Sequence, residues 1–501
     1  MALATVYARA QNGMQSQLIT VEVHLANGMP GFTVVGLPEA AVRESKDRVR
    51  AALQNAGFNF PIKRITVSLA PADVPKEGSR FDLAIAIGIL VASEQMSAEL
   101  LTDHEFIGEL ALSGEIRQVR GILPTALACA QTGRALILPA DNAGEAALIG
   151  SLTGYKAKHI LDIFAHSQGQ QLLPRIIFQP PDHHADSPLD FADIKGQEHA
   201  KRVLLIAAAG GHNVLMIGSP GTGKSMLASR LPTILPDMTE AEALETASLY
   251  SISHHGFNVE QWGKRPFRHP HHSASSPALV GGGSNPKPGE ISLAHNGVLF
   301  LDELPEFPRQ VLEVLREPLE NQFICISRAA RQIQYPANFQ LIAAMNPCPC
   351  GYLGDSDKAC TDSPEQVARY RNKISGPFID RLDIIVEVPR IKHEQLNEAT
   401  PPEYGSAYMR RQVKAARERQ IARQGVANAG LNPAQINHYC SLSESGLVML
   451  NQAAKALNLS MRSYHRIQKL ARTIADLDAA EAIDNNHLAE AIQLRRIEWS
   501  G

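Results

Sequence analysis

The chain has 501 residues, 44% of them hydrophobic and 20% charged, and a chain of this length folds into about three domains. This composition excludes collagen, a long coiled coil and general disorder. Because 48 Lys and Arg oppose 51 Asp and Glu, the net charge of −3 excludes a uniformly basic surface, and any contact with nucleic acid must be local. Six cysteines, without a secretory pattern or an apolar run of membrane length, predict a cytoplasmic protein that makes no membrane contact.

The first 170 residues predict an α/β domain. Short apolar or alternating segments between Gly and Pro predict strands at 19–25, 31–37 and 64–70. Between the last two, the apolar residues of 39–57 recur on one face of a helix. The segment 81–93 is apolar nearly throughout, and its periodicity leaves open whether it is a buried helix or a buried strand.

The rest of the chain divides by composition. A polar, Pro-rich stretch predicts a linker over 171–190. In 191–395, strand-like runs alternate with helical patterns, which predicts a parallel sheet covered by helices on both faces. The expected strands of that sheet lie within 212–218, 297–304, 339–347 and 382–389. Residues 396–501 are rich in Ala, Arg, Gln and Leu at helical spacing and predict a helical bundle.

A glycine-rich loop after the first of these strands carries the strongest signal. Its spacing, G-x4-G-K-S, lets backbone N–H groups wrap closely around phosphate oxygens at the start of a helix. The lysine supplies charge to the β- and γ-phosphates, and the serine hydroxyl is a ligand for Mg²⁺. The predicted nucleotide-binding residues are Gly218, Ser219, Pro220, Gly221, Thr222, Gly223, Lys224 and Ser225.

Polar residues end the next two strands. Asp302 and Glu303 follow the hydrophobic run 298–301, where Asp302 is suited to hold Mg²⁺ and Glu303 to orient and deprotonate an attacking water. Asn346 ends the following strand and is expected to bind the γ-phosphate and that water; the alternative is an Asn that opens a turn before a proline. An Asp-Glu pair at the end of a strand, in a chain that also has a phosphate loop, predicts hydrolysis of the nucleotide as well as its binding.

Two arginines further along the chain are candidates to stabilise the transition state. Arg381 precedes a strand and is expected to reach into the nucleotide site of a neighbouring subunit, unless it only pairs with Asp380 or Asp383 in the same turn. Arg462 begins an Arg-rich helix and is expected to cover the phosphates from a lid, unless it lies on a solvated helix face.

The order of these features resembles the AAA+ ATPases: a phosphate loop, an Asp-Glu strand, an Asn strand, a late Arg and an Arg in a helical lid. The segments MNPCPCG, SGPFIDRLD and ARTIADL are similar to the magnesium-chelatase-like branch, and GFTVVGLPE and LAPADVPKEG resemble the YifB/ComM family. The resemblance covers nearly the whole chain. It implies a hexameric ATPase that uses ATP and Mg²⁺ and acts on single-stranded or branched DNA, by branch migration or helicase activity, during recombination of transforming DNA.

The resemblance also implies a Lon-protease-like fold for the N-terminal domain. Proteases of that kind use a Ser–Lys dyad, but here Arg80 stands where the nucleophile would be, and Ser79 is one position away. After Lys76 the next lysine is Lys156, so no base lies at the expected distance. We therefore expect a non-proteolytic domain that serves assembly or substrate guidance.

Contacts with DNA are expected from two basic segments, because ring motors track phosphates with Lys and Arg on loops that enter the pore. The first supplies Arg265, Arg268 and Lys287, and the second, a hairpin-like segment, supplies Arg328 and Arg331. The alternative is an ordinary basic surface, either solvated or between subunits.

Three cysteines are candidate zinc ligands. Cys348, Cys350 and Cys360 resemble a zinc knuckle that some relatives build from two C-x-C pairs, with Lys358 here in the place of the fourth thiolate. A fourth ligand would then come from elsewhere, such as Asp355 or a histidine, and a loop without metal is the alternative.

Three other functions compete with a DNA motor. A metal-insertion ATPase like the magnesium chelatase subunit shares the ATPase core but lacks the Lon-like domain. Arg80 opposes a Lon-like ATP-dependent protease, and Glu303 opposes a switch that binds ATP without hydrolysing it.

Overall fold

The computed structural model describes residues 3–179, 188–283, 286–328, 331–391 and 401–495. The chain forms two compact units. Unit 1 comprises Met1–His183, Glu240–Trp262 and Ala329–Ile333, and unit 2 comprises the remaining residues, His184–Thr239, Gly263–Arg328 and Gln334–Gly501. Residues 180–187 of the expected linker, like much of the loose segment before the C-terminal helices, lie outside the described residues.

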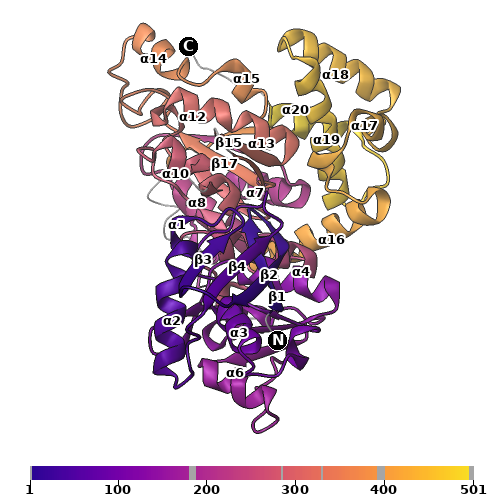
Figure 1. Ribbon diagram of the computed structural model, residues 1–501. Coiled ribbons are helices and arrows are strands. Elements are labelled where there is room, and N and C mark those ends of the chain that lie inside the picture. Colours follow the sequence, from indigo (N-terminus) through magenta and orange to yellow (C-terminus); the bar gives the residue numbers. More distant parts are fainter. Residues whose placement is uncertain (1–2, 180–187, 284–285, 329–330, 392–400, 496–501) are drawn as a thin grey trace. The chain divides into compact units, whose positions relative to one another are not determined.

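Unit 1 is built on a seven-stranded mixed sheet (Figure 1). Its first two strands pair antiparallel, as do β2 and β4, and every other ladder of the sheet is parallel. In sheet order the strands are β3 (Gly31–Val35), β4 (Arg64–Ala70), β2 (Gln15–Ala26), β1 (Leu3–Asn12), β5 (His104–Phe106), β8 (Ala135–Pro139) and β9 (Gly154–Ala157). A short ladder of β6 (Glu109–Leu110) and β7 (Ile116–Arg117) stands apart from it.

The helices of unit 1 resolve the ambiguous segments. The segment 81–93 holds a helix, α3 (Asp82–Ala92), whose residues are all buried and which packs on β1 and β2. The helix expected over 39–57 is two helices that meet at Glu44, α1 (Ala40–Arg43) and α2 (Ser45–Asn55). The other helices are α4 (Ile122–Thr132), α5 (Ala143–Ala146) and α6 (Ile160–Ser167).

One helix of unit 1 comes from the middle of the chain. Helix α9 (Glu240–Ile252) lies in sequence between the phosphate loop and the Asp-Glu strand, yet it packs on α4. Two hydrogen bonds join its last turn to the rest of unit 1. The Ser251 carbonyl oxygen accepts from Gly121 N at 2.9 Å, and the Ser251 hydroxyl donates to Glu145 Oε2 at 2.7 Å. From the sequence, 191–395 is expected to form one domain, so the sequence does not predict that this helix belongs to unit 1.

Unit 2 holds a five-stranded sheet whose ladders are all parallel. The strand order is β11 (Phe267–Arg268), β14 (Val298–Leu301), β17 (Gln340–Met345), β10 (Val214–Ile217) and β18 (Ile384–Glu387). The last four are the predicted strands, and all but the final residue of β18 are buried, as expected for a sheet covered on both faces. The two-residue β11 is too short to leave a pattern in the sequence.

Helices and short hairpins surround this sheet. The helices are α7 (Glu198–Gly210), α8 (Lys224–Arg230), α10 (Ser276–Val280), α11 (Glu290–Leu293), α12 (Arg309–Val314), α13 (Arg316–Asn321), α14 (Pro364–Arg371) and α15 (Gly376–Ile379). Two-stranded ladders are formed by β12 (Gly281–Gly282) with β13 (Lys287–Pro288) and by β15 (Phe323–Arg328) with β16 (Arg331–Pro336).

The C-terminal part is helical, as predicted, and shares one hydrophobic core with the sheet. It contains α16 (Ser406–Gln424), α17 (Pro433–Tyr439), α18 (Glu444–Ala456), α19 (Met461–Leu477) and α20 (Asn485–Gln493), of which α16 and α19 pack on α7. The buried Asp383, just before β18, pairs with Arg466 of α19 and accepts Asn213 N at 2.8 Å before β10. None of the helices that the structure describes is long and apolar enough to cross a bilayer.

Candidate nucleotide site

The phosphate loop lies at the carboxyl end of β10, between β17 and β18 in the sheet. Ligands of parallel α/β sheets bind at this end of the strands. The loop must be glycine-rich here, because Gly223 has φ +89° and a Cβ on Gly218 would lie 2.3 Å from the Val388 carbonyl oxygen. Helix α8 begins directly after it at Lys224, so its N-terminal backbone N–H groups face the loop.

Lys224 is buried at the centre of this loop. Its Nζ donates to the carbonyl oxygens of Gly218 at 2.7 Å and Ser219 at 3.0 Å, and to Asn346 Oδ1 at 3.4 Å. Burial lowers the pKa of Lys224, and the nearby carboxylates of Asp302 and Glu303 act in the opposite direction. The phosphate loop and the ends of β14 and β17 are therefore brought together around one ammonium group.

Asp302 and Ser225 form the candidate magnesium site. Ser225 Oγ donates to Asp302 Oδ2 at 2.6 Å, which places a hydroxyl and a carboxylate side by side at the start of α8. Hard oxygen ligands of this kind suit Mg²⁺. Asp302 Oδ1 also accepts the backbone N–H of Glu303 at 2.9 Å, so the end of β14 is fixed.

Glu303 adopts a conformation that is unusual for a residue other than glycine. Its φ is +52°, in the left-handed region, where it begins the 3-10 turn Leu304–Glu306. Its side chain is 54% exposed, which leaves the carboxylate open to water. His272 Nδ1 lies 3.0 Å from Glu303 Oε2, a contact that the sequence patterns do not predict.

The two candidate arginines share one acidic partner. Arg381 is buried and contacts Glu320 Oε1 through Nη2 at 2.6 Å, while Arg462, 57% exposed, contacts the same oxygen at 2.8 Å. The expected alternative partners of Arg381 pair elsewhere, Asp383 with Arg466 and Asp380 with Arg495. The structure thus brings Arg381 and Arg462 together at the end of α13, and Glu320 is a residue that sequence reasoning missed.

A cluster of four metal-ligating side chains lies beside the phosphate loop. The sulfur atoms of Cys348, Cys350 and Cys360 lie 3.4 to 3.6 Å apart, and all four candidate ligand atoms, Asp362 included, lie within 4.8 Å of one another. The fourth member of the cluster is therefore Asp362, which differs from Asp355 and histidine, the examples that the sequence analysis offers for the outside ligand. The sequence does carry a signal for this residue, since Cys360 and Asp362 repeat the C-x-C spacing of Cys348 and Cys350.

The loop that carries this cluster is packed against the phosphate loop. A Cβ on Gly351 would lie 2.7 Å from a ring carbon of Pro220. The pKa of the Asp355 carboxyl is lowered, first by the neighbouring Ser219 hydroxyl of the phosphate loop and then by the backbone N–H groups of Asp357 and Lys358, which donate to Asp355 Oδ1 at 2.9 and 3.1 Å. Asp355 thus lies beside the phosphate loop and is outside the cysteine cluster, contrary to its expected role as a zinc ligand.

The residues expected to contact DNA differ in their surroundings. Arg265 donates to the Pro236 and Asn296 carbonyl oxygens at 2.6 and 2.7 Å, and Arg268 forms a bidentate pair with Glu290 at 2.5 and 2.6 Å. These contacts favour a structural role for both arginines. Lys287 lies in β13, Arg328 is the last residue of β15 and Arg331 is the first residue of β16.

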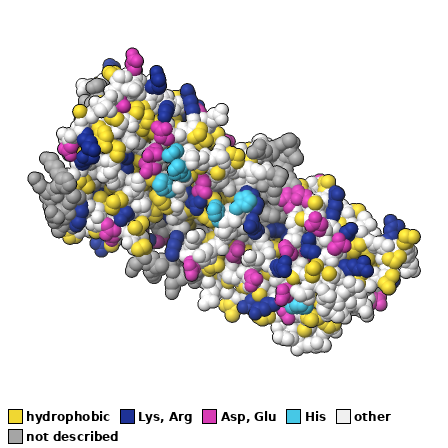
Figure 2. Space-filling view, turned by 90° about the vertical axis from the view of Figure 1, so that its left-hand side faces the viewer, with side chains coloured by type: hydrophobic (Ala, Val, Ile, Leu, Met, Phe, Trp, Pro, Cys, Tyr) yellow, Lys and Arg dark blue, Asp and Glu magenta, His cyan; other side chains and the backbone are white. Residues whose placement is uncertain are grey.

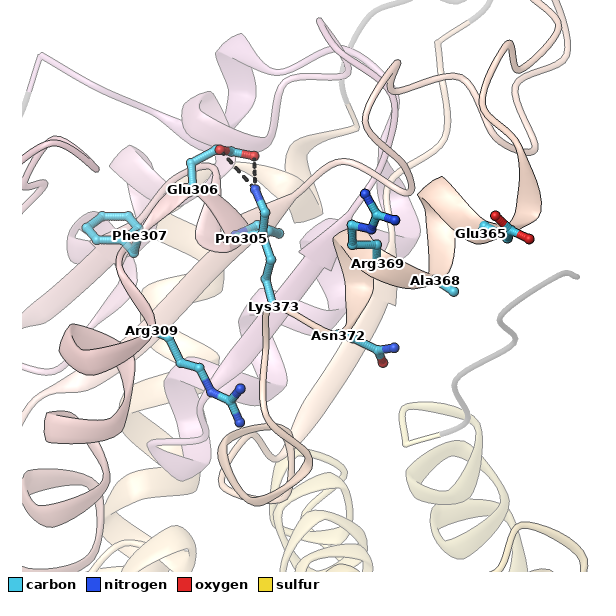
Figure 3. A pocket seen from close by; sticks show the side chains of 9 residues that line it. All are labelled: Pro305, Glu306, Phe307, Arg309, Glu365, Ala368, Arg369, Asn372 and Lys373. Atoms are coloured by element: carbon cyan, nitrogen blue, oxygen red, sulfur yellow. Dashed lines mark hydrogen bonds and ion pairs between the residues drawn. The ribbon is translucent and has the colours of Figure 1, made fainter.

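A separate cavity of about 820 Å³ opens beside the exit of β14 (Figure 3). It is lined on one side by the segment from Pro305 to Arg309 and on the other by α14 and Lys373, which pairs with Glu306 at 3.2 Å. Its lining contains no residue of the phosphate loop.

In unit 1, the side chains of Lys76, Ser79 and Arg80, which the sequence analysis compares with a protease nucleophile segment, make contacts within the fold. Arg80 is buried, donates to the Arg120 carbonyl oxygen, and has its pKa lowered by burial to about 10. Ser79 donates to Glu109, and the Lys76 ammonium donates to the Pro71 carbonyl oxygen. Ser79 and Lys76 therefore have separate partners.

Most of the chain matches models of magnesium chelatase families. Residues 190–396 match the family described as magnesium chelatase, subunit ChlI. Residues 21–142 match subunit ChlI of Mg-chelatase, and 403–495 match the C-terminal part of that subunit.

Individual relatives extend the similarity over nearly the whole length. The chain is 53% identical to Competence protein ComM of Haemophilus influenzae and 48% identical to the Escherichia coli protein YifB, in each case over 99% of this chain and 98% of the relative. It is 25% identical to the magnesium-chelatase 38 kDa subunit of Rhodobacter capsulatus over 60% of this chain and 84% of that protein. With identity of this level through both units, the chain belongs to the YifB/ComM family of magnesium-chelatase-like AAA+ proteins, a family that implies an ATPase using ATP and Mg²⁺.

Proposed function

We propose that this protein is a ring-forming motor that hydrolyses ATP and moves along branched or single-stranded DNA, by branch migration, during recombination of incoming DNA in natural transformation. The observation that carries the proposal is the convergence of Lys224, Ser225, Asp302, Glu303 and Asn346 at the ends of three adjacent parallel strands. The full-length similarity to a competence protein supports the assignment to transformation.

Each residue of this site has a chemical role in the proposal. The phosphate loop and Lys224 bind the β- and γ-phosphates, and Ser225 and Asp302 hold Mg²⁺, which when bound neutralises phosphate charge. Asn346 orients the attacking water, and Glu303 takes its proton. The exposure of Glu303 and the approach of Asn346 to Lys224 support these roles.

We propose that the site is completed by a second copy of the chain, in a ring that is expected to be a hexamer. Arg381 would enter the site of the neighbouring protomer, and Arg462 would approach the phosphates from the helical lid. Within one protomer both arginines are held by Glu320, so each must leave that carboxylate to act. The pair of the buried Asp383 with Arg466 supports a lid whose helix α19 is coupled to the base of β10 and β18.

DNA contact is assigned to Arg328 and Arg331, at the end of β15 and the start of β16, and to Lys287. Arg265 and Arg268 are left out of this assignment, because their guanidinium groups are used within the fold. On the face in Figure 2, Lys and Arg side chains are interspersed with Asp and Glu and do not merge into one basic area, which supports contact through local loops.

We also propose that Cys348, Cys350, Cys360 and Asp362 bind one zinc ion. Tetrahedral thiolates at about 2.3 Å from zinc lie about 3.8 Å apart, close to the 3.4 to 3.6 Å between these sulfur atoms. The Cys350 backbone N–H donates to Asp362 Oδ2 at 2.8 Å, which fixes the carboxylate at the cluster. Because the same loop packs on Pro220, zinc would rigidify the support behind the phosphate loop.

For unit 1 we propose a non-proteolytic, Lon-like domain. The buried Arg80 at the nucleophile position and the separate partners of Ser79 and Lys76 support the absence of a dyad there. The competing function is a metal-insertion ATPase, favoured by the three chelatase family matches.

One assay separates these functions. The ATPase rate of the purified protein is measured with no DNA, with single-stranded DNA and with a forked duplex, with Lys224→Ala as the inactive control. A motor is stimulated at least several-fold by DNA and displaces a strand from a synthetic junction. Hydrolysis that ignores DNA would favour the metal-insertion function, and absence of hydrolysis would reject both.

A further inference from the structure

We propose that the cavity beside the exit of β14 receives the end of α13 from a second copy of the chain, whose Glu320 pairs there with Arg309 and Arg369; this inference rests on the proposed ring. Within one protomer Glu320 is held by Arg381 and Arg462. Both arginines must leave this carboxylate to reach the phosphates of a bound nucleotide. The carboxylate then needs new cationic partners, because an unpaired acid beside phosphate oxygens would repel them.

Two cations that line the cavity are available for this purpose. Arg309 begins α12 and Arg369 lies in α14, and neither forms a hydrogen bond or an ion pair with a residue in the part of the chain that the structure describes. The third cation of the lining, Lys373, is already joined to Glu306 at 3.2 Å (Figure 3). The cavity therefore offers two guanidinium groups to a carboxylate from outside the protomer.

The acids that could satisfy these arginines along their own helices do not do so. Glu313, four residues after Arg309, receives Arg316 Nη1 at 2.6 Å and the Ser375 hydroxyl at 2.7 Å. Glu365, four residues before Arg369, extends away from that arginine in Figure 3. The fold thus leaves a local excess of positive charge on both walls of the cavity.

The cavity lies on the same edge of the sheet as the nucleotide site. One wall starts at Pro305, two residues after Glu303, in the turn that follows β14. The other wall, α14, is joined to the end of β17, because Arg371 Nε donates to the Pro347 carbonyl oxygen at 3.1 Å. A neighbouring chain that delivers Arg381 to this edge brings the end of α13 with it.

The end of α13 fits the cavity in size and in charge. Glu320 and Asn321 are exposed at the end of this helix, and Gln322 follows them with φ +63°. A helix with its side chains is about 10 to 12 Å across, so one turn occupies roughly 400 to 600 Å³. The cavity of about 820 Å³ can accept such a turn, and its two arginines are complementary to the carboxylate.

The test reverses charge on each side of the proposed contact in the full-length protein. The cavity variant is Arg309→Glu with Arg369→Glu, and the helix-end variant is Glu320→Lys. Each variant alone brings like charges together at every interface of a ring. The protein concentration for half-maximal assembly, measured by sedimentation velocity with a non-hydrolysable ATP analogue, is therefore expected to rise about 10²-fold.

An equal mixture of the two variants is expected to assemble near the wild-type concentration. In a ring where they alternate, each introduced lysine meets two introduced glutamates, and each native Glu320 meets the native Arg309 and Arg369. Misfolding of either variant could not be rescued in this way. Arg411→Glu with Lys414→Glu, at two exposed residues of α16, makes the same change of charge as the cavity variant and is the matched control, expected to assemble like the wild type.

Three outcomes overturn the inference. They are assembly of the cavity variant at the wild-type concentration, a mixture that assembles no better than either variant alone, and an equal loss of assembly in the control. Failure of the proposed ring is a separate result, because it would appear as wild-type protein that stays monomeric with the ATP analogue.

Discussion

A partly buried carboxyl group in unit 1, that of Glu145, makes the stability of this unit dependent on pH. Burial raises the pKa of Glu145 to about 7, and the hydrogen bond from Ser251 only partly opposes this effect. The ordinary value is 4.5, so between these two pH values the folded protein keeps a proton that the unfolded chain releases. Unfolding is therefore favoured as pH rises through this window, and the full penalty of about 3 kcal/mol is present above pH 7.

Glu145→Gln removes this titration but keeps an oxygen that can accept from Ser251. The variant is expected to be more stable than wild type by about 1 kcal/mol at pH 5 and about 3 kcal/mol at pH 8. Urea unfolding followed by the fluorescence of Trp262, which is buried in unit 1, measures this difference once the other tryptophan of the chain, Trp499, is replaced by Phe. Glu99→Gln, in the short 3-10 turn Glu99–Leu101, is the surface control.

The reasoning would be refuted by a stability gain for Glu145→Gln that is the same at pH 5 and pH 8. It would also be refuted by an equal pH-dependent gain for Glu99→Gln, because the effect would then not depend on burial at the contact with α9.

Three further predictions concern the nucleotide site and the cysteine cluster. Glu303→Gln is expected to bind ATP with wild-type affinity in a filter-binding assay and to hydrolyse it about 10²-fold or more slowly; rapid turnover would move the base elsewhere. Arg381→Ala is expected to lower the ATPase rate of the ring about 10³-fold or more, and mixing it with Lys224→Ala protomers should restore activity, because each variant supplies what the other lacks. If the mixture stays inactive, Arg381 does not act between protomers. Asp362→Ala is expected to lose zinc from a content of one per chain by elemental analysis, whereas Asp362→Cys keeps it; equal zinc in Asp362→Ala would remove Asp362 from the ligand set.

The central sheet of unit 2 is well predicted from the sequence, because its strands are buried on both faces and read as continuous apolar runs. The ends of those strands then lead directly to Asp302, Glu303 and Asn346. The same reasoning cannot find β11, which has two residues, and so it misses that His272 emerges beside Glu303. A contact of this kind depends on strand order, which no local pattern encodes.

Other misses have different physical causes. Helix 39–57 shows one apolar face, but the pattern does not reveal the break at Glu44, where a new helix starts. Glu320 lies 61 residues from Arg381, and no spacing rule links an acid to a base at such a distance. Sequence reasoning points to Asp355 as the carboxylate near the cysteines, and only the fold of the loop shows that Asp362 is the one that lies at the three sulfur atoms.

Because α9 belongs to unit 1 but lies in sequence within unit 2, it limits how the protein can be cut into separate fragments. A cut near residue 184 does not yield two independent polypeptides, since the shorter piece loses a helix that its own α4 packs against. The longer piece keeps that helix with its apolar side uncovered, including Ala243, Leu249 and Ile252. A fragment that contains unit 2 alone therefore requires that Glu240–Trp262 be replaced by a short connection as well as removal of the N-terminal residues.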